Sequence, residues 1–339
     1  MRREIGSDFW SIPQKDAKSS LFENVTWFAS GRAALRAILQ QIPQDTGISS
    51  LKVALPSYLC ESMIKPLEIE GISYAFYDVC LNNGLIQCDC STTYDCNVIL
   101  VLDYFGYEST VIKNQNKNQI VIRDLTHSVF GKDYDDADYY YGSFRKWAGF
   151  AGGGFAFKEE GKIFCPTFSQ DEYFALRHYA MDLKRQYIFE ETDSKEYLTL
   201  FHEAEIMLNE CEVSLCGLND IEAAEALDVD FIKNARRENA KYLIEGLNDY
   251  CLFKSLMVDV CPLCVPILCE NRDELRRYLV SKRIYCPVHW PKPEQVSYNA
   301  SKTLYEKELS LVCDQRYTIN DMKTIVNEVG LFLEKEKNA

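Results

Sequence analysis

The sequence has no run of about 18 apolar residues, the length that a membrane-spanning helix needs. The first residues, MRREIGSDFWSIP, lack the apolar core of a secretory signal. No basic tract with interleaved aromatic residues occurs, and the formal net charge is −14. Proteins bind nucleic acid by neutralising phosphates with clustered lysine and arginine, so we expect no nucleic-acid partner. These absences predict a cytoplasmic protein that has no membrane partner.

The 14 cysteines do not follow the spacing of a disulfide framework. They are scattered through strand-like segments, which predicts reduced thiols. Cys261 and Cys264 form one CxxC pair, and such a pair is either a redox motif, half of a zinc site or part of an edge strand. No second pair follows at zinc spacing, and the neighbouring residues are proline and apolar side chains. We therefore expect an edge strand and no metal.

Strand-like and helix-like segments alternate along the first half of the chain. Hydrophobic residues make up 47% of the 339 residues and charged residues 26%, as in ordinary globular proteins. Ser30 is a natural N-cap for the helix that follows it. Alternation of this kind favours βαβ units and a largely parallel sheet. The predicted strands are 53–55, 74–77, 98–102, 120–122 and 137–141, and the predicted helices are 31–42, one beginning near 57 and one around 111.

The second half of the chain is predicted to be mostly helical. The charged and aromatic segment 169–209 indicates one or two long helices, and 231–247 indicates another, with Arg236 and Arg237 on a solvated face. A strand at 261–268 and helices at 271–283 and 319–333 follow. The chain is long enough for two domains, which we place at 1–227, a large domain with an N-terminal arm, and 228–339, a small C-terminal domain.

The stretch from Ile120 to Phe157 contains the strongest functional signal. One strand ends at Asp124, and the next leads through Ser143 to Lys146 and then to three glycines. The carboxyl ends of parallel strands open into one crevice, so both side chains are expected to face it. Pyridoxal 5'-phosphate (PLP) needs a lysine amine for a Schiff base and a carboxylate beside its ring nitrogen. The alternative interpretation of Lys146 is a surface lysine that follows a strand.

These residues resemble the DegT/DnrJ-type aminotransferases, which belong to the fold-type I PLP-dependent enzymes. The resemblance runs from Gly6 to Tyr317 and is most specific at 124–127 and 143–154. It implies an α/β fold with a mostly parallel central sheet flanked by helices, and a smaller C-terminal α/β domain. It also implies a homodimer, with Lys146 as Schiff base and proton shuttle and Asp124 as partner of the pyridinium nitrogen.

The resemblance implies further cofactor-binding residues. Gly31 and Arg32 match the turn that cradles the phosphate, although the family has threonine in place of the arginine, and Ser143 either binds the phosphate or ends a strand. Tyr58 matches the aromatic residue that stacks on the cofactor ring. His127 stands where the family commonly has glutamine, and it either contacts the ring or its phenolic oxygen or is a core histidine.

The implied function is transfer of an amino group from an amino acid such as glutamate to a keto acceptor, with a nucleotide-linked keto-sugar as the family's typical acceptor. Relatives that dehydrate sugars have histidine in place of the lysine, so Lys146 favours amine transfer. Two alternatives stay open, another PLP reaction such as elimination and a non-catalytic PLP-binding sensor or scaffold. Gly153 replaces a glutamate that many members carry, so an unusual acceptor is also compatible with the sequence.

Several residues beyond the central stretch were candidates for the substrate site. His289 and Arg316 resemble segments that close over the active site, although both could be packing residues. A group of basic side chains could attract a phosphorylated acceptor or could simply be solvated; it comprises Arg177, His178, Lys184, Arg185 and Lys292.

Overall fold

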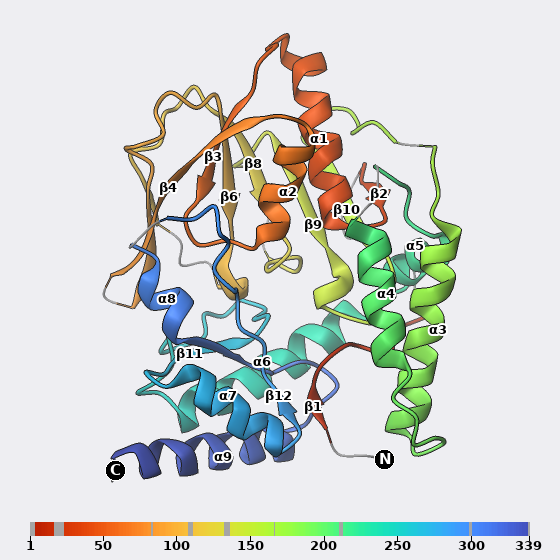
Figure 1. The fold of residues 1–339 in the computed structure, drawn as a ribbon, viewed down its shortest axis with the longest axis vertical. Helices are drawn as coiled ribbons and strands as arrows, with labels where there is room; N and C mark the ends of the chain where they lie inside the picture. Colours follow the sequence, from red (N-terminus) through yellow and green to blue (C-terminus); the bar gives the residue numbers. More distant parts are fainter. Residues whose placement is uncertain are drawn as a thin grey trace.

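A nine-stranded sheet forms the centre of the computed structural model, which describes residues 4–16, 24–82, 84–107, 111–131, 136–165, 167–209, 213–297 and 300–337 (Figure 1). Five neighbouring strands in its middle, β9, β8, β6, β3 and β4, are all parallel. The largely parallel α/β sheet that the sequence predicts is therefore confirmed. In spatial order the strands are β2 (Thr26–Phe28), β10 (Gly154–Lys158), β9 (Tyr139–Ser143), β8 (Ile120–Asp124), β6 (Val98–Leu102), β3 (Lys52–Pro56), β4 (Ser73–Asn82), β5 (Leu85–Asp89) and β7 (Val111–Lys113).

The register of β8 and β9 brings the two predicted catalytic residues to one edge of the sheet. Asp124 lies opposite Tyr141, and β9 continues into the short helix η2 (Phe144–Lys146). The predicted helix around residue 111 is wrong, because Val111 and Ile112 pair with β5 as strand β7. A polar run from 113 to 119 follows these two β-branched residues, so no apolar face of helical period could form there.

The helices pack against the sheet and beside it (Figure 1). Ser30 caps the first helix as predicted, because its Oγ accepts a hydrogen bond of 3.1 Å from the N–H of Ala33. The segment 169–209 contains two long helices that pack together, α3 and α4. The helices of this part are α1 (Gly31–Thr46), α2 (Glu61–Ile69), α3 (Asp171–Ile188), α4 (Tyr197–Asn209) and α5 (Leu218–Glu225), with a 3-10 turn η1 (Tyr104–Gly106).

The C-terminal elements form a separate layer below the sheet in Figure 1, with an apolar core of their own. The N-terminal arm belongs to this layer, because β1 (Ile5–Gly6) pairs with β12 in parallel and Ile5 is buried in that core. The domain boundary near Leu227 stays a proposal, and it would fall between α5 and α6. The elements are α6 (Val229–Gly246), β11 (Val265–Leu268), α7 (Arg272–Ser281), β12 (Ile284–Tyr285), α8 (Lys302–Lys307), β13 (Glu308–Leu311) and α9 (Ile319–Lys337).

Arg236 is fully buried, so its predicted place on a solvated face of α6 is wrong. Its guanidinium donates to Oε1 of Gln315 (2.9 Å) and to the carbonyl of Leu263 (2.8 Å), and it lies 4.5 Å from the ring centre of Trp147. These contacts fix the C-terminal layer against the residue that follows Lys146. None of the helices in the described ranges is long and apolar enough to cross a bilayer.

Candidate functional site

A cavity of about 440 Å³ opens at the carboxyl ends of β8 and β9. Six of the seven residues that the sequence assigns to the cofactor line it: Gly31, Arg32, Asp124, His127, Ser143 and Lys146. They come from β8, β9 and α1 and from the turns that follow the strands. The volume lies within the range of small-molecule sites.

Lys146 and His127 are paired inside this cavity. The Nζ atom of Lys146 lies 2.9 Å from Nε2 of His127, and Nδ1 of His127 accepts a hydrogen bond of 3.1 Å from the N–H of Phe105. A neutral imidazole has one N–H, so an accepting Nδ1 places the proton on Nε2. Nε2 then donates to Nζ, which can accept only as a neutral amine.

Burial favours the same protonation states. It lowers the pKa of Lys146 and holds the pKa of His127 well below its usual value, because a charged form loses hydration in a buried site. The nearby thiol of Cys60 and the carboxylate of Asp124 act against the shift at Lys146 and do not cancel it. Lys146 is therefore disposed to act as a nucleophile or a base.

The loop after β6 is shaped so that it can present its N–H to His127. Phe105 has φ 60, a left-handed conformation that costs roughly 1–2 kcal/mol in a residue with a side chain. Gly106 follows with φ 84, and a Cβ there would lie 2.5 Å from the carbonyl oxygen of Cys261. Only glycine fits at residue 106, which explains why the turn after β6 ends in glycine.

Asp124 closes the opposite end of the cavity and is almost fully buried. Its Oδ1 accepts from the N–H of Thr126 (2.8 Å), and its Oδ2 accepts from the hydroxyl of Tyr141 (2.9 Å). Burial raises the pKa of Asp124, while these two hydrogen bonds stabilise its ionised form. A cationic ring nitrogen placed here would be paired with a fixed carboxylate. The partnership of Tyr141 with Asp124 was not predicted from the sequence.

The N-terminus of α1 lines the cavity. Ser30, Gly31, Arg32 and Ser143 line the cavity there, and backbone N–H groups at a helix start attract phosphate. Gly154 of β10 allows this approach, because a Cβ at that residue would lie 2.2 Å from the backbone of Ser30. Gly154, the last glycine of the run 152–154, therefore has a packing role that positions the turn.

Three arginines surround Glu205 near the N-terminus of α1, and they come from α1, η2 and α3. Arg145 and Arg177 both contact Oε1 of Glu205, the latter at 3.4 Å, and Arg32 lies 3.6 Å from Oε2. Burial would raise the pKa of Glu205, yet Arg145 and the other two arginines hold it below its usual value. The Nε atoms of Arg145 and Arg177 are buried without a hydrogen-bond partner in the described chain. The cluster has capacity for a further anion.

A second cavity, of about 490 Å³, lies between the sheet domain and the C-terminal layer. It shares Asp8, Arg145, Lys146 and Arg177 with the first cavity, so Lys146 lies between the two. Its other side includes Arg276 and His289 from the C-terminal layer. The lysine can thus be reached from both sides.

Tyr58 is not among the residues that line either cavity, which corrects the expectation that it stacks on the cofactor. It is fully buried, donates to the carbonyl of His289 and lies against Trp290, with ring centres 5.3 Å apart. Trp290 instead lines the cavity, stacked on His127 at 5.2 Å. Cys60, two residues after Tyr58 in the same loop, lines the cavity in its place.

The basic residues proposed for the substrate separate into different environments. Only Arg177 lines the cavities, whereas Lys184 is buried 3.9 Å from Glu4, and Arg185 pairs with Asp182 on the surface. His178 lies 3.5 Å from Asp220. Lys292 is not among the residues that line either cavity.

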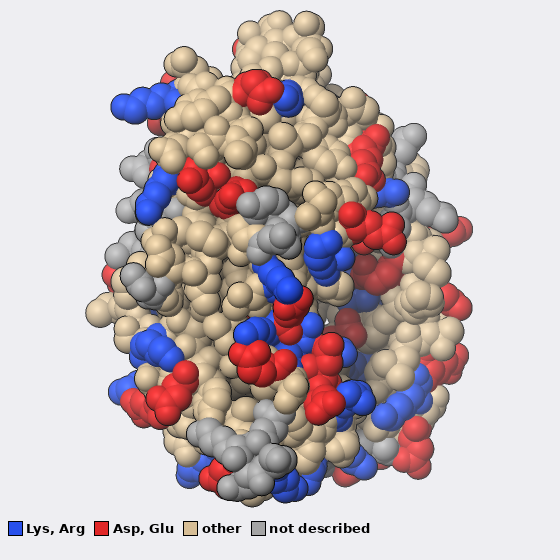
Figure 2. Space-filling model, turned by 60° about the vertical axis from the view of Figure 1, so that its left-hand side comes forward, with Lys and Arg blue, Asp and Glu red and all other residues tan. Residues whose placement is uncertain are grey.

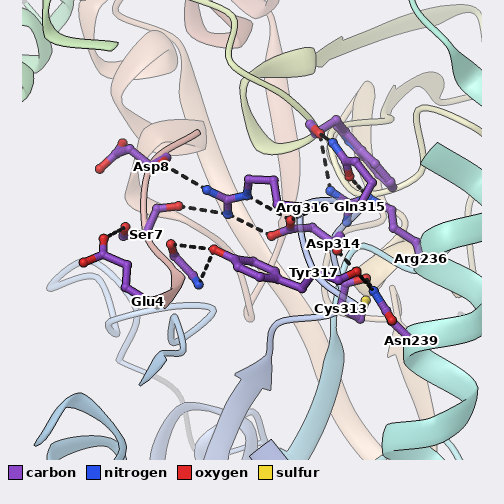
Figure 3. A network of polar contacts seen from close by, with 12 residues as sticks. Glu4, Ser7, Asp8, Arg236, Asn239, Cys313, Asp314, Gln315, Arg316 and Tyr317 are labelled. Atoms are coloured by element: carbon purple, nitrogen blue, oxygen red, sulfur yellow. Dashed lines mark hydrogen bonds and ion pairs between the residues drawn. The ribbon is translucent and has the colours of Figure 1, made fainter. Parts of the chain in front are cut away.

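Arg316 joins the N-terminal arm to the C-terminal layer, although it also borders the second cavity (Figure 3). It pairs with Asp314 at 2.8 Å, donates to the carbonyl oxygens of Ser7 and Asp8, and lies 3.9 Å from the ring centre of Phe9. Its charge is already balanced by a buried carboxylate.

Cys261 and Cys264 are both buried, and the CxxC segment precedes β11 rather than forming part of it. Within the described residues, no three His, Cys, Asp or Glu side chains are grouped as a metal site would require.

Comparisons with known proteins agree on the architecture. No family model matches the chain, and no curated protein matches it by sequence. Among solved structures, it is similar to a DegT DnrJ EryC1 StrS aminotransferase from Brucella abortus, with 18% identity, a TM-score of 0.57, and 91% of this chain and 85% of that one covered. A structure described as the putative sugar aminotransferase Spr1654 from Streptococcus pneumoniae, in its PLP form, has 15% identity and a TM-score of 0.61, with 92% of this chain and 87% of that one covered. A NifS-like protein has 10% identity and a TM-score of 0.58, with 92% of this chain and 82% of that one covered. The chain therefore has the fold of the DegT/DnrJ-type aminotransferase structures.

Proposed function

We propose that this protein is a PLP-dependent aminotransferase. The observation that carries the proposal is a neutral lysine, Lys146, held by His127 in a cavity with Asp124 at one end and a helix N-terminus at the other. The similarity to solved aminotransferase structures supports the assignment. When bound, PLP supplies an aldehyde that condenses with amines and a cationic ring that accepts electron density.

The described residues fit each part of this cofactor. Asp124, fixed by Tyr141, would pair with the ring nitrogen, and Ser143 and the start of α1 with Arg32 would hold the phosphate. Lys146 would attach the aldehyde as a neutral nucleophile. After release by an incoming amine, the Nζ atom would take up and return the proton that moves during amine transfer.

The cofactor assignment is tested by borohydride reduction of the protein with PLP, followed by peptide mapping. We expect the label on Lys146 and no label in Lys146→Met. Lys184 is the informative competitor, because burial lowers its pKa to about 8 and it too is therefore reactive. A label on Lys184, or no chromophore in folded protein supplied with PLP, would overturn the assignment.

The reaction type is tested by adding single amino acids to the loaded protein. An aminotransferase converts PLP to pyridoxamine phosphate, with glutamate as the expected donor. Release of ammonia would indicate elimination, and no spectral change with any donor would indicate a sensor or scaffold.

We propose an acceptor that carries an anionic group, with a nucleotide-linked keto-sugar as the first candidate. Acidic and basic side chains are interspersed over the face in Figure 2, and the net charge of −14 does not attract anions at long range. Attraction must therefore be local, and the partly unpaired arginines Arg145 and Arg177 lie where the two cavities meet.

The acceptor is tested with the pyridoxamine phosphate form of the protein. UDP- or dTDP-4-keto-sugars should return it to the PLP form, and Arg177→Met should raise the acceptor KM about tenfold, the loss expected for one charge-assisted hydrogen bond. If small oxo acids or aldehydes alone discharge it, the sugar assignment is wrong while the aminotransferase assignment stands.

A further inference from the structure

Three side chains in the C-terminal layer form a hydrogen-bonded line that ends at the second cavity. Ser310 donates from Oγ to Oε1 of Glu308 (2.5 Å), and Oγ lies 2.7 Å from Nδ1 of His289. The backbone N–H of His289 also donates to Oε2 of Glu308 (2.8 Å). Glu308 and Ser310 are completely buried, whereas the ring of His289 borders the cavity that contains Lys146.

This arrangement fixes the direction in which His289 can act. Because Nδ1 is engaged with Ser310, the nitrogen that remains for a ligand in the cavity is Nε2. The imidazole of His289 meets that of His127 edge to face, with ring centres 5.0 Å apart, and His127 in turn contacts Lys146. His289 and Lys146 therefore face the same space from opposite domains.

Among the described residues, no cationic side chain directly contacts the carboxylate of Glu308. Arg272 of α7 donates to the backbone carbonyl of Glu308 at 2.9 Å, and its charge only partly opposes the effect of burial. Burial raises the pKa of Glu308 to about 8, so the carboxyl group can gain or lose a proton near neutral pH. The titratable and charged groups that face it are Tyr58, Cys264, Arg272, Cys286 and His289.

We propose that Glu308, Ser310 and His289 form a proton relay that gives the cavity a second acid and base opposite Lys146. Uptake of a proton at Nε2 of His289 forms one N–H bond, and the Nδ1 proton passes to Oγ of Ser310. The hydroxyl proton of Ser310 passes to Oε1 of Glu308. At the end of the relay the three side chains hold one additional proton, which lies on Glu308. The hydroxyl of Ser310 is restored, and His289 is neutral both before and after the transfer.

The relay explains how a histidine that resists charging can still exchange protons. Burial holds the pKa of His289 well below its usual value, and the positive charge of a protonated Lys146 would lower it further. Passing the proton to Glu308 avoids an imidazolium in this site. In catalysis the relay rests on the proposed aminotransferase function, where it would protonate or deprotonate the substrate's oxygen or nitrogen while Lys146 serves the carbon.

The relay itself is tested without cofactor, by NMR titration of the histidine rings. The chain has only 4 histidines, and His289→Gln identifies the signal of His289. We expect that signal to shift with an apparent pKa near 8, and we expect the shift to disappear in Glu308→Gln. Glu328→Gln, a carboxylate of α9 in the same layer, is the matched control and should leave the shift in place.

An unchanged titration in Glu308→Gln, or no movement of the His289 signal between about pH 6.5 and 9.5, would overturn the relay. Ser310→Ala is the substitute test if Glu308→Gln does not fold. It removes the hydroxyl between His289 and Glu308 and keeps both end residues, so the shift of the His289 signal near pH 8 should disappear. This experiment does not depend on PLP, so its outcome is separate from that of the borohydride test.

The catalytic part is tested with the loaded protein, by following the donor reaction against pH. The wild type should show an inflection near pH 8 that Glu308→Gln and Ser310→Ala lose, with the rate at pH 7 reduced about tenfold or more. A purely structural role would lower the rate by the same factor at every pH, and that result would contradict the relay in catalysis.

Discussion

The hydrogen bond from His127 supports the neutral state of Lys146 that burial already favours. His127→Asn keeps an acceptor for the N–H of Phe105, since the Asn oxygen replaces Nδ1, but removes the Nε2 donor. The pKa of Lys146 should therefore rise, because only the neutral amine benefits from that donor. Each unit of increase reduces the neutral fraction at pH 7 about tenfold. The measurement is the pH dependence of the rate at which PLP reacts with the protein.

Lys184→Met is the control for this rate, since it removes another buried lysine that does not line the first cavity. If His127→Asn and the wild type give the same pH profile, His127 does not set the protonation state of Lys146.

Tyr141 is expected to contribute to cofactor affinity through Asp124. Tyr141→Phe deletes the hydroxyl that donates to Oδ2, and hydrogen bonds to charged groups contribute about 1.5–3 kcal/mol. Loss of this bond should raise the pKa of Asp124 and weaken PLP binding by roughly tenfold or more. Equilibrium titration of the protein with PLP measures this. Unchanged affinity for PLP in Tyr141→Phe would mean that Asp124 does not pair with the ring nitrogen. Tyr139→Phe is the control, because it removes a hydrogen bond to Asp45 and should leave PLP affinity unchanged.

The pattern of strands predicted the site residues that lie close together along the chain, and it missed those that come from distant segments. Asp124 and Lys146 follow consecutive parallel strands, so the pattern of strands was sufficient to bring them to one edge. Trp290 and Glu308 come from C-terminal segments, and their approach depends on packing between parts of the chain that are far apart in sequence. Tyr58 was misplaced because a shift of two residues in a loop changes which side chain lines the cavity, and Cys60 lines it instead.

At the scale of elements, helices and central strands with clear periodicity were predicted well. The predicted strand 98–102 is β6, and the capped helix at 31–42 is the beginning of α1. Strand β5 was missed and the edge strand β7 was assigned to a helix, because segments of five and three residues are too short to show a clear period. The pairing of β1 with β12 could not be read from the pattern, since two residues have no periodicity.

The contact of the N-terminal arm with the C-terminal layer should depend on Arg316 and Asp314 (Figure 3). Arg316→Met leaves Asp314 buried without its cation, and removal of one partner of a buried pair costs about 3–5 kcal/mol. We expect a decrease of that size in the free energy of unfolding, measured with urea, and faster proteolysis of the arm. The double variant with Asp314→Asn should recover most of the loss. Equal stability of the single and double variants would show that the ion pair is not the cause.

At the scale of the whole molecule, the sequence predicts a homodimer through its family resemblance, and two-fold pairs are the commonest assembly. The arm residues Phe9 and Trp10 are candidates for the contact between subunits, because they lie against Arg316 of their own chain and stay partly exposed. Light scattering of the loaded protein should give twice the chain mass of 39.1 kDa. A monomer with full activity would exclude a shared active site.

The pH dependence of global stability should contain the signature of Glu308. Its folded-state pKa is raised to about 8 by burial, whereas an unfolded glutamate has a pKa of about 4.3. Between these values the folded chain holds one proton that the unfolded chain has lost. Stability then falls as pH rises, by about 1.4 kcal/mol per pH unit, and this decline ends once pH passes the folded pKa.

Glu308→Gln removes this titration and keeps a side chain of the same size. The free energy of unfolding of the wild type minus that of Glu308→Gln should therefore fall steadily from about pH 5.5 to pH 8 and stay constant above it. Urea unfolding at intervals across this range measures the difference, with Glu328→Gln, which changes another carboxylate of the same layer, as the matched control. Parallel stability curves for wild type and Glu308→Gln would mean that Glu308 is ionised throughout, and a carboxylate that never accepts a proton could not end the relay.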